Sequence, residues 1–566
     1  MNKLFIPFIF SIVLTLINTK VIPTKDLQTA LTQARPGDII EIESGYYSDS
    51  KFTLKSGLQL KPIIIRPAPK ANVIFSGTKN NCIFSGVGVS YITIEGPMEL
   101  IDGYCGIIIR KGNYINITGL TIQDVQDEGI AISGNNNHIY NNTINNCAMS
   151  NSHYPTEKFS GWPSCLSVFS AGYDFSTNII VEKNFIYNGY GEGIDLYECN
   201  NCKVIKNTVK NTYNISIYIR ASKNIVLDSN TIRINSDRYN SYYGRACGIG
   251  LTPKTGRNYI ENILISNNII LGTRIGIIFL ALDYNGGYDK ISILHNTLWA
   301  VSYAPVIFKS PCNDPTECEM KNNFIYVDGI KEFEYNNLWS FGYNYYYNTY
   351  KVPSIYSDNT SKAAKKLDIS TIFNVIKGCE INDYLNNENI DEKCFHPSKT
   401  PGSFNLYHGG VNTKVNNDHS SCKRSSYSPS IGAYEYPYDC SEEPSNTDIT
   451  YIEYDVKFKI NACVSGTNTV KMVSSFCNWD IISCNTMHDE GNCLWSITYK
   501  EGTAYNFSYR FVIVDGNTAI KWESEPNREF NGYDLAVLAD ESQSGKYQSC
   551  SFSKSGTLVT LHCSWR

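Results

Sequence analysis

The stretch from Gly193 to Ile232 reads GIDLYECNNCKVIKNTVKNTYNISIYIRASKNIVLDSNTI, and a short phrase within it returns at a fixed step. KNTV at 206–209 recurs as SNTI at 229–232, and 230 − 207 gives 23 residues. KNFI at 183–186 precedes the first of these by the same step. A fixed period of roughly 20–50 residues is the sequence signature of stacked structural units. This repeat therefore decides how most of the chain folds.

Each repeat contains short alternations of apolar and polar residues, such as Ile194/Leu196 and Ile217/Ile219. Alternation with a period of two is typical of β-strands and not of helices. The strands follow one another too closely for helical crossovers, which need roughly a dozen or more residues. We therefore expect each repeat to be one turn of a coil whose strands pair with those of the next turn. This fold is a parallel β-helix.

The asparagine of the phrase supports the same prediction. Asn tolerates the left-handed backbone that a sharp bend between two strands requires. Stacked about 4.8 Å apart, such side chains can form a hydrogen-bonded ladder. A general richness in Asn is the alternative explanation, but the residue recurs in one phrase at Asn142, Asn184, Asn207, Asn230, Asn268, Asn296 and Asn323.

Residues 1–22 read as a secretory signal, with Lys3 followed by an apolar run from Leu4 to Ile17. That run is too short to span a bilayer, and no later stretch is long enough. We expect a secreted or lumenal protein with no membrane span. Nineteen cysteines in an exported chain imply several disulfides, and the odd count leaves at least one outside an intrachain pair. The net charge of −5 gives no reason to expect a nucleic-acid partner.

From Asp26 the chain reads DLQTALTQARPGDIIEIESGYY, which resembles the opening of secreted right-handed β-helix proteins, polysaccharide lyases among them. The resemblance implies a short capping helix over Asp26–Ala34, which covers the open end of the coil. Rungs are expected to about Val327, and SIGAYEY at Ser430–Tyr436 resembles the closing strand; the strands of 343–412 are not placed. The predicted fold is a right-handed parallel β-helix over 23–436. This scaffold carries lyases, hydrolases, epimerases and non-enzymes, so the resemblance does not predict the chemistry.

A polar segment at 437–448 reads as a linker, and the pattern changes after it. Longer alternating strands without the repeated phrase predict an antiparallel β-sandwich over 449–566. The expected strands are Ile452–Asn461, Asn468–Ser474, Leu494–Tyr499, Tyr509–Val514 and Leu558–Cys563.

Four landmarks follow in order within the second domain: FCNWD from Phe476, CLWSI, SYRFVIVDGN and KWESEPNRE from Lys521. This succession closely resembles the family-20 starch-binding module found at the C-termini of glucoamylases and other amylolytic enzymes. The resemblance implies one sugar site for starch or a glycogen-like α-glucan, because the Tyr positions of the family's second site are not found. The residues implied for that site are Trp479, Arg510, Trp522, Glu523 and Asn527. Arg510 stands where the family has Lys, and a planar guanidinium differs in geometry from an ammonium.

The residue types support the binding role on their own. A pyranose ring offers an apolar face of C–H groups, against which an indole buries a large area at little conformational cost. Trp479 and Trp522 are flanked by charged or polar turn residues, which favours binding over a place in the core. Trp495 alternates with apolar strand residues, and we expect it in the core.

Outward-facing residues of the coil form a candidate catalytic group. The 23-residue step places Asp195 beside Tyr218, and Tyr197 beside Arg220. A glycosidase needs two carboxylates, here Asp195 with Glu192 or with Glu128, whereas a lyase needs a base and a cation that neutralises a uronate. The candidate catalytic residues are Glu192, Asp195, Tyr218, Arg220 and Lys254. Ordinary solvated charges on a non-catalytic spacer or lectin-like scaffold are the alternative, and the sequence specifies neither substrate nor cofactor.

Cysteine spacing gives no metal site. Cys199-x-x-Cys202 has no second pair or His at a suitable distance, so a local disulfide or stacked thiols are expected. Cys312–Cys318 and Cys484–Cys493 would close short loops and are predicted disulfides. Sequons at Asn116, Asn141, Asn214, Asn359 and Asn506 permit glycosylation.

Overall fold

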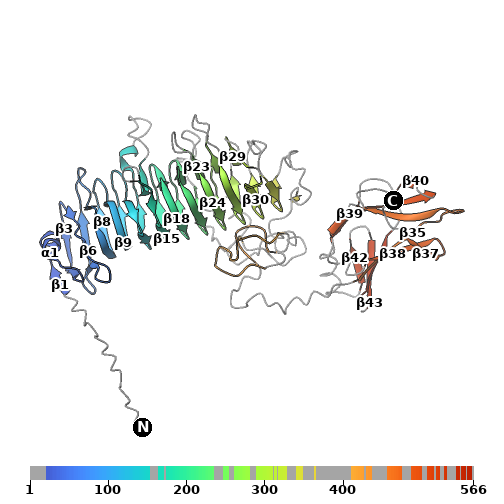
Figure 1. Ribbon diagram of the computed structural model, residues 1–566, viewed down its shortest axis with the longest axis horizontal. Helices are drawn as coiled ribbons and strands as arrows, with labels where there is room; N and C mark the ends of the chain where they lie inside the picture. The colour runs from blue at the N-terminus through green and yellow to red at the C-terminus, as the bar shows by residue number, and fades with distance from the viewer. Residues whose placement is uncertain are drawn as a thin grey trace, which may run out of the picture. The chain divides into compact units, whose positions relative to one another are not determined.

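The computed structural model divides the chain into two compact units, Met1–Ser441 and Glu442–Arg566. The boundary falls inside the segment expected to be a linker. Each unit is described here by itself (Figure 1). The described residues are 21–152, 163–170, 174–234, 246–253, 260–280, 288–301, 303–309, 312–314, 316–327, 340–348, 362–364, 395, 410–425, 429–435, 455–474, 486–499, 506–515, 518–522, 528–531, 544–547, 550–555 and 558–563.

The first unit is a coil of parallel strands with three faces, as the successive turns from β6 to β30 in Figure 1 show. Two long strands, β8 (Ser90–Ile101) and β9 (Ile107–Gln123), run from one face to another. The first face contains β4 (Phe52–Thr53), β7 (Phe84–Val87), β10 (Ile130–Asn135), β13 (Ser164–Val168), β17 (Glu192–Tyr197), β20 (Ile215–Arg220), β23 (Cys247–Thr252), β26 (Ile275–Phe279) and β29 (Ala304–Phe308).

The other two faces follow the first in every turn. The second face contains β1 (Val21–Thr24), β2 (Ile39–Ile42), β5 (Ile63–Pro67), β11 (His138–Tyr140), β14 (Ser176–Thr177), β15 (Ile180–Glu182), β18 (Cys199–Ile205), β21 (Lys223–Asp228), β24 (Glu261–Ser266), β27 (Asp289–Leu294), β30 (Glu319–Lys321) and β32 (Ser340–Gly342). The third contains β3 (Gly45–Tyr47), β6 (Val73–Ser76), β12 (Thr143–Asn145), β16 (Phe185–Tyr187), β19 (Thr208–Lys210), β22 (Thr231–Arg233), β25 (Ile269–Leu271), β28 (Thr297–Val301), β31 (Phe324–Val327), β33 (Tyr345–Asn348) and β34 (Lys362–Ala364).

The register of these strands is the one that the 23-residue step predicts. Asp195 pairs with Tyr218 and Tyr197 with Arg220 between β17 and β20. The apolar residues that alternate with them fill the inside of the coil, where Ile217 is fully buried. Burying one such side chain contributes roughly 1.5–3 kcal/mol, so the stacked rungs supply most of the stabilisation of this unit.

The asparagine ladder is confirmed and extends further than expected. Each buried Asn donates from Nδ2 to Oδ1 of the next over 2.9–3.0 Å, from Asn142 through Asn323 to Asn344. The rungs therefore continue past Val327 into β32, β33 and β34, where the sequence had placed no strands. The left-handed backbone belongs to the residue before each ladder Asn, as at Lys206 (φ 56°), and not to the Asn itself.

The N-terminal cap is confirmed. Helix α1 (Leu27–Gln33) buries Leu27 and Leu31, and Asp26 accepts a hydrogen bond from the Thr29 amide at 3.0 Å. Strand β1 pairs with β2 from Val21 onward, so the first rung overlaps the last two residues of the expected signal segment. The signal segment itself lies outside the described residues up to position 20.

The expected closing strand is wrong. Residues 430–435 form no strand but belong to a side segment (410–425 and 429–435) that lies against a corner of the coil. The Gly432 amide donates to the Asn322 carbonyl at 2.8 Å, and the Ala433 amide donates to Thr297 Oγ1 at 3.0 Å. These backbone groups bind corner positions of the rungs instead of pairing in a ladder.

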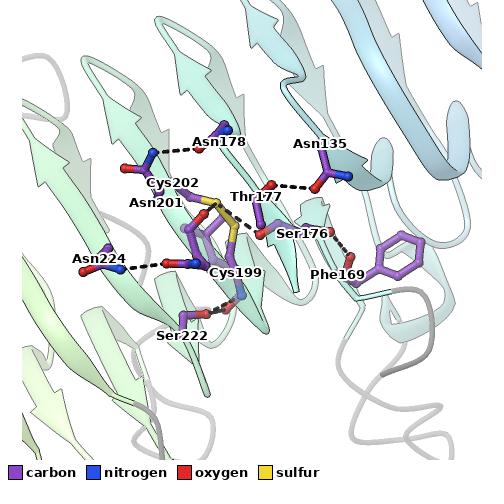
Figure 2. The surroundings of a disulfide bond; sticks show 12 residues. Asn135, Phe169, Ser176, Thr177, Asn178, Cys199, Asn201, Cys202, Ser222 and Asn224 are labelled. Carbon is purple, nitrogen blue, oxygen red and sulfur yellow. Dashed lines mark hydrogen bonds between the residues drawn. A yellow bond between two sulfur atoms is a disulfide. The ribbon is translucent and has the colours of Figure 1, made fainter. Parts of the chain in front are cut away.

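The disulfides confirm two predicted pairs and correct a third. Cys199–Cys202 lies within β18, beside Ser222 (Figure 2), and Cys312–Cys318 closes a loop. Asn201 adopts φ 57°, which interrupts the strand alternation so that both Cys199 and Cys202 point inward. Cys493 pairs with Cys463 and not with Cys484, because the Cys463 and Cys493 Cα atoms lie 4.3 Å apart on neighbouring chain segments.

The second unit contains two sheets around one core, as expected for a sandwich. The six-stranded sheet has the order β37 (His488–Gly491), β38 (Leu494–Tyr499), β35 (Asp455–Asn461), β44 (Leu558–Cys563), β43 (Cys550–Ser555) and β42 (Ser544–Tyr547). The other sheet has β36 (Thr469–Ser474), β39 (Asn506–Asp515), β40 (Thr518–Trp522) and β41 (Arg528–Asn531). All these pairings are antiparallel except β35–β44, which is parallel. Phe458, Met472 and Phe511 bring both sheets into the same core.

Candidate functional site

The candidate catalytic residues gather where β17 and β20 lie side by side on the first face. Ile194 and Leu196 point into the coil, so Asp195 points away from the interior. It is nevertheless buried, with 3% of its surface exposed. A Cβ on Gly193 would lie 2.3 Å from the Ser216 carbonyl oxygen, so only glycine allows the start of β17 to approach the next rung this closely. We call Asp127, Glu128, Glu192 and Asp195 the acidic cluster.

Asp195 is held by one guanidinium. Arg220 donates from Nε to Asp195 Oδ1 at 2.9 Å and from its terminal nitrogen to Oδ2. The Arg220 guanidinium lies 4.7 Å from the ring centroid of Tyr197 and 5.4 Å from that of Tyr218. Burial raises the pKa of Asp195, and Arg220 opposes that rise. Because both oxygens accept N–H donors, the geometry is that of an ionised carboxylate in a charge-assisted pair.

Glu192 has neutral hydrogen-bonding partners. Ser164 Oγ donates to its Oε2 and Asn214 Nδ2 to its Oε1, each at 3.2 Å. Burial, with the nearby charge of Asp195, raises the pKa of Glu192 to about 8, although Arg220 counteracts this. Glu192 therefore carries its proton at neutral pH, while Asp195 in the same strand has its charge balanced by Arg220. Environments that separate two carboxyl groups in this way are characteristic of acid and base assignments.

The acidic cluster continues into the preceding turn. Burial raises the pKa of Glu128 to about 8, and the charges of Asp127 and Asp195 add to the rise. A hydrogen bond to Asp127 raises the pKa of Tyr104 to about 12. On the other side, Tyr218 donates to or accepts from Thr252 Oγ1 at 2.8 Å, and burial raises its pKa to about 12.

One buried hydroxyl beside Asp195 has no partner. Ser167 on β13 is in register with Asp195 on β17, so both side chains point to the same side of the first face. Ser167 is 6% exposed, and its Oγ makes no hydrogen bond. A buried hydroxyl without a partner costs roughly 1–3 kcal/mol, so a group that supplies one would gain that energy.

The structure brings together Glu192, Asp195, Tyr218 and Arg220, whereas Lys254 lies outside the described residues. Sequence reasoning missed Ser164, Ser167 and Asn214. The step from Ser164 to Glu192 is 28 residues (192 − 164) and not 23, because a loop is inserted between the two rungs. Without the fixed step, the sequence carried no signal for the register of β13.

The expected sugar site of the second unit falls largely outside the described residues, which exclude Trp479, Glu523 and Asn527. The backbone positions of Arg510 and Trp522 lie on the adjacent strands β39 and β40, where Val512 pairs with Trp522. Trp495 is confirmed as a core residue. It is 5% exposed and donates from Nε1 to the Ala462 carbonyl at 3.0 Å.

Metal ligation and membrane crossing were also considered for the described ranges. Within them, no group of three or more His, Cys, Asp or Glu side chains is arranged to hold a metal ion. Among the same residues, no helix combines the length and apolar character needed to cross a bilayer.

Comparisons with known proteins define the class. Residues 72–298 match the family model for a right handed beta helix region, and residues 453–535 match that for a starch binding domain. The chain thus combines a right-handed parallel β-helix with a starch-binding domain, and is a carbohydrate-binding protein whose partner is a starch-like polysaccharide. It is 33% identical to a glucoamylase of Neurospora crassa over 92 residues, which is 15% of this chain and 15% of that protein's length.

Two solved structures resemble the chain loosely. Pectate lyase Pel9A is 14% identical with a TM-score of 0.43, and the match covers 74% of this chain and 96% of that one. An alginate lyase from Paenibacillus is 17% identical with a TM-score of 0.40, covering 58% of this chain and 97% of that one.

Proposed function

We propose that the protein docks on starch or a glycogen-like α-glucan through Trp479 and Trp522, and that its β-helix cleaves a polysaccharide as a hydrolase or lyase. The match of residues 453–535 to a starch-binding domain carries the docking half, because it contains both indoles. Arg510, Glu523 and Asn527 would supply hydrogen bonds to the sugar hydroxyls. The chain spans only 15% of the glucoamylase it matches, so the activity of that enzyme is not transferred.

Starch retention tests the docking half. Trp522→Ala in the full chain should remove most retention on insoluble starch, because each aromatic platform contributes roughly 1–3 kcal/mol. That loss corresponds to roughly tenfold or more in affinity. Trp495→Ala is the contrasting variant and should unfold the second unit instead, as a core truncation of about 3–5 kcal/mol would. Normal retention by Trp522→Ala would show that the platform was misassigned.

The acidic cluster carries the catalytic half. Buried carboxyl groups outside the core of a coil are expensive, and a scaffold gains nothing by keeping them there. Strongly perturbed carboxyl groups of this kind are instead frequent at catalytic sites. In the proposed role Glu192 gives a proton to a leaving group and Asp195 accepts one, while Tyr218 and Arg220 hold Asp195 in place. Lys254 remains a proposed member of the site.

A non-catalytic scaffold is the second candidate. The bidentate Arg220–Asp195 pair favours it, because such a pair can exist for structural reasons alone. Incubation of the protein with a panel of α-glucans and uronate polymers separates the two. New reducing ends or a new C=C absorbance support the enzyme, and neither product across the panel supports the scaffold.

We also propose export from the cell. The six disulfides among the described residues are typical of an oxidising compartment. Residues 1–22 would act as the signal peptide. Cleavage near position 22, read by N-terminal sequencing of the secreted protein, tests this, whereas an intact Met1 in the mature protein would contradict it.

A further inference from the structure

We infer that the acidic cluster hydrolyses an uncharged glycan, with Glu192 as proton donor, Asp195 as base and Ser167 as a ligand for a substrate hydroxyl. This inference rests on the catalytic half of the proposed function and narrows its substrate class. It excludes uronate polymers, which a lyase would cleave.

The balance of charge is the first support. Four carboxyl groups face one another here, those of Asp127, Glu128, Glu192 and Asp195, from the segment before β10 and from β17. The only guanidinium among the described residues that acts on them is Arg220, and it is engaged by Asp195. The remaining titratable neighbours, Tyr104 and Tyr218, are neutral. A uronate would bring a further negative charge to carboxyl groups whose ionised form burial already disfavours.

Hydrogen-bonding geometry separates the two carboxyl groups on β17. Glu192 meets only the neutral side chains Ser164 and Asn214, which do not compensate a negative charge. Asp195 receives two N–H donors from a cation. The proton therefore stays on Glu192 and the negative charge on Asp195, which is the division that glycoside hydrolysis needs.

Ser167 is the independent sign of a ligand. Its hydroxyl is buried, lacks a partner and lies in register with Asp195. A site that hydrogen-bonds a substrate hydroxyl leaves such a group unpaired when the substrate is absent. Sugars present hydroxyl groups on every ring, so a neutral glycan satisfies Ser167 without adding charge.

The hydrolytic step balances with water as the co-reactant. The bond between the anomeric carbon and the glycosidic oxygen breaks, and that oxygen takes the proton of Glu192. The oxygen of one water molecule forms the new bond to the anomeric carbon, and its proton passes to Asp195. Exchange with solvent then returns the proton from Asp195 to Glu192, so the net reaction consumes one water.

The test uses the full chain with soluble starch and other neutral α- and β-glucans, and with alginate and polygalacturonate. We expect new reducing ends from a neutral glycan and no unsaturated product from any polymer. Unsaturated product from a uronate polymer would overturn this inference and leave the proposed function standing. No product from any polymer would overturn both, whereas starch docking is measured separately by retention.

Variants assign the roles. Glu192→Gln and Asp195→Asn should each lower kcat on the neutral glycan by roughly 100-fold or more, as the loss of a general acid or base does. Glu95→Gln, a half-buried carboxyl on β8 outside the cluster, should leave kcat unchanged and serves as the matched control. Because Asp195→Asn also breaks an ion pair, Ser167→Ala gives a second reading. It should raise KM roughly tenfold with kcat retained, and an unchanged KM would remove Ser167 from the site.

Discussion

Two groups of buried charges lie on the outside of the same coil, and they differ in how completely their charges are compensated. In the side segment, Arg424 binds Glu435 at 3.2 Å and the carbonyls of Gly432 and Ala433. Glu435 accepts from both the amide and the hydroxyl of Ser430, and Asp418 accepts from the Cys422 and Glu435 amides. One nitrogen, Arg424 Nε, has no partner.

The acidic cluster has the opposite character. Four carboxyl groups share one guanidinium, Glu192 has only neutral partners, and the Ser167 hydroxyl has none. A network whose charges are matched fixes a chain segment in place, whereas an unmatched network stores a cost that binding can relieve. The difference separates a structural site from a functional one on a single scaffold. It also states what each variant should do.

The largest expected effect on stability is at the side segment. Arg424→Met should lower the free energy of unfolding by about 3–5 kcal/mol, because it leaves Glu435 and Asp418 buried without their cation. Urea unfolding of the full chain measures this, with Lys423→Met as the control at the exposed neighbouring position. If Arg424→Met unfolds at the same urea concentration as the native protein, the ion pair does not hold the segment, and the comparison fails on its structural side.

The acidic cluster should instead reveal itself in the pH dependence of stability. Burial raises the pKa of Glu192 from 4.5 to about 8, so the folded protein keeps this proton longer than the unfolded chain does. The stability that Glu192 contributes is therefore present below pH 4.5 and is lost as the pH rises through about 8. Within that window each such group lowers the free energy of unfolding by about 1.4 kcal/mol per pH unit.

Glu192→Gln isolates this contribution. Glutamine mimics the protonated form, so the variant should match the native protein near pH 5 and lose less stability by pH 8, by about 3 kcal/mol. Glu128 and Glu435, whose pKa values burial raises to about 8 and about 7, keep the rest of the slope in both proteins. Chemical denaturation at pH 5, 6.5 and 8 measures the difference. Parallel curves for the two proteins would mean that Glu192 is ionised in the folded state.

The sequence predicted the regular part of the coil because one side-chain type repeats at one backbone position. Asn207 and Asn230 gave the 23-residue step, and that step alone predicted the pairing of Asp195 with Tyr218. Where loops change the step, the register is lost to sequence reasoning, as for Ser164 and Ser167. The acidic cluster was therefore only half visible.

The side segment was not predicted because its bonds join side chains to corner positions far away in the chain. His295 Nδ1 meets the Ser430 carbonyl at 3.0 Å across 135 residues, with no repeat to indicate the pairing. Disulfide partners share this limit: Cys463 and Cys493 are 30 residues apart, and a nearer cysteine fits the spacing equally well. Periodic contacts can thus be predicted from the sequence, whereas single contacts cannot.

The smallest expected effect gives the most direct comparison of the two sites, because it removes the same hydroxyl from each. Ser430→Ala deletes a donor that lies 3.0 Å from a buried carboxyl oxygen of Glu435, and should cost about 1–2 kcal/mol of stability. Ser167→Ala deletes a hydroxyl that has no partner, so stability should stay within about 0.5 kcal/mol of the native value or rise slightly. Urea midpoints of both variants at one pH, with unchanged slopes, measure the contrast. An equal loss in the two variants would show that Ser167 is already hydrogen-bonded in the folded protein, and its place as a substrate ligand would fall with that result.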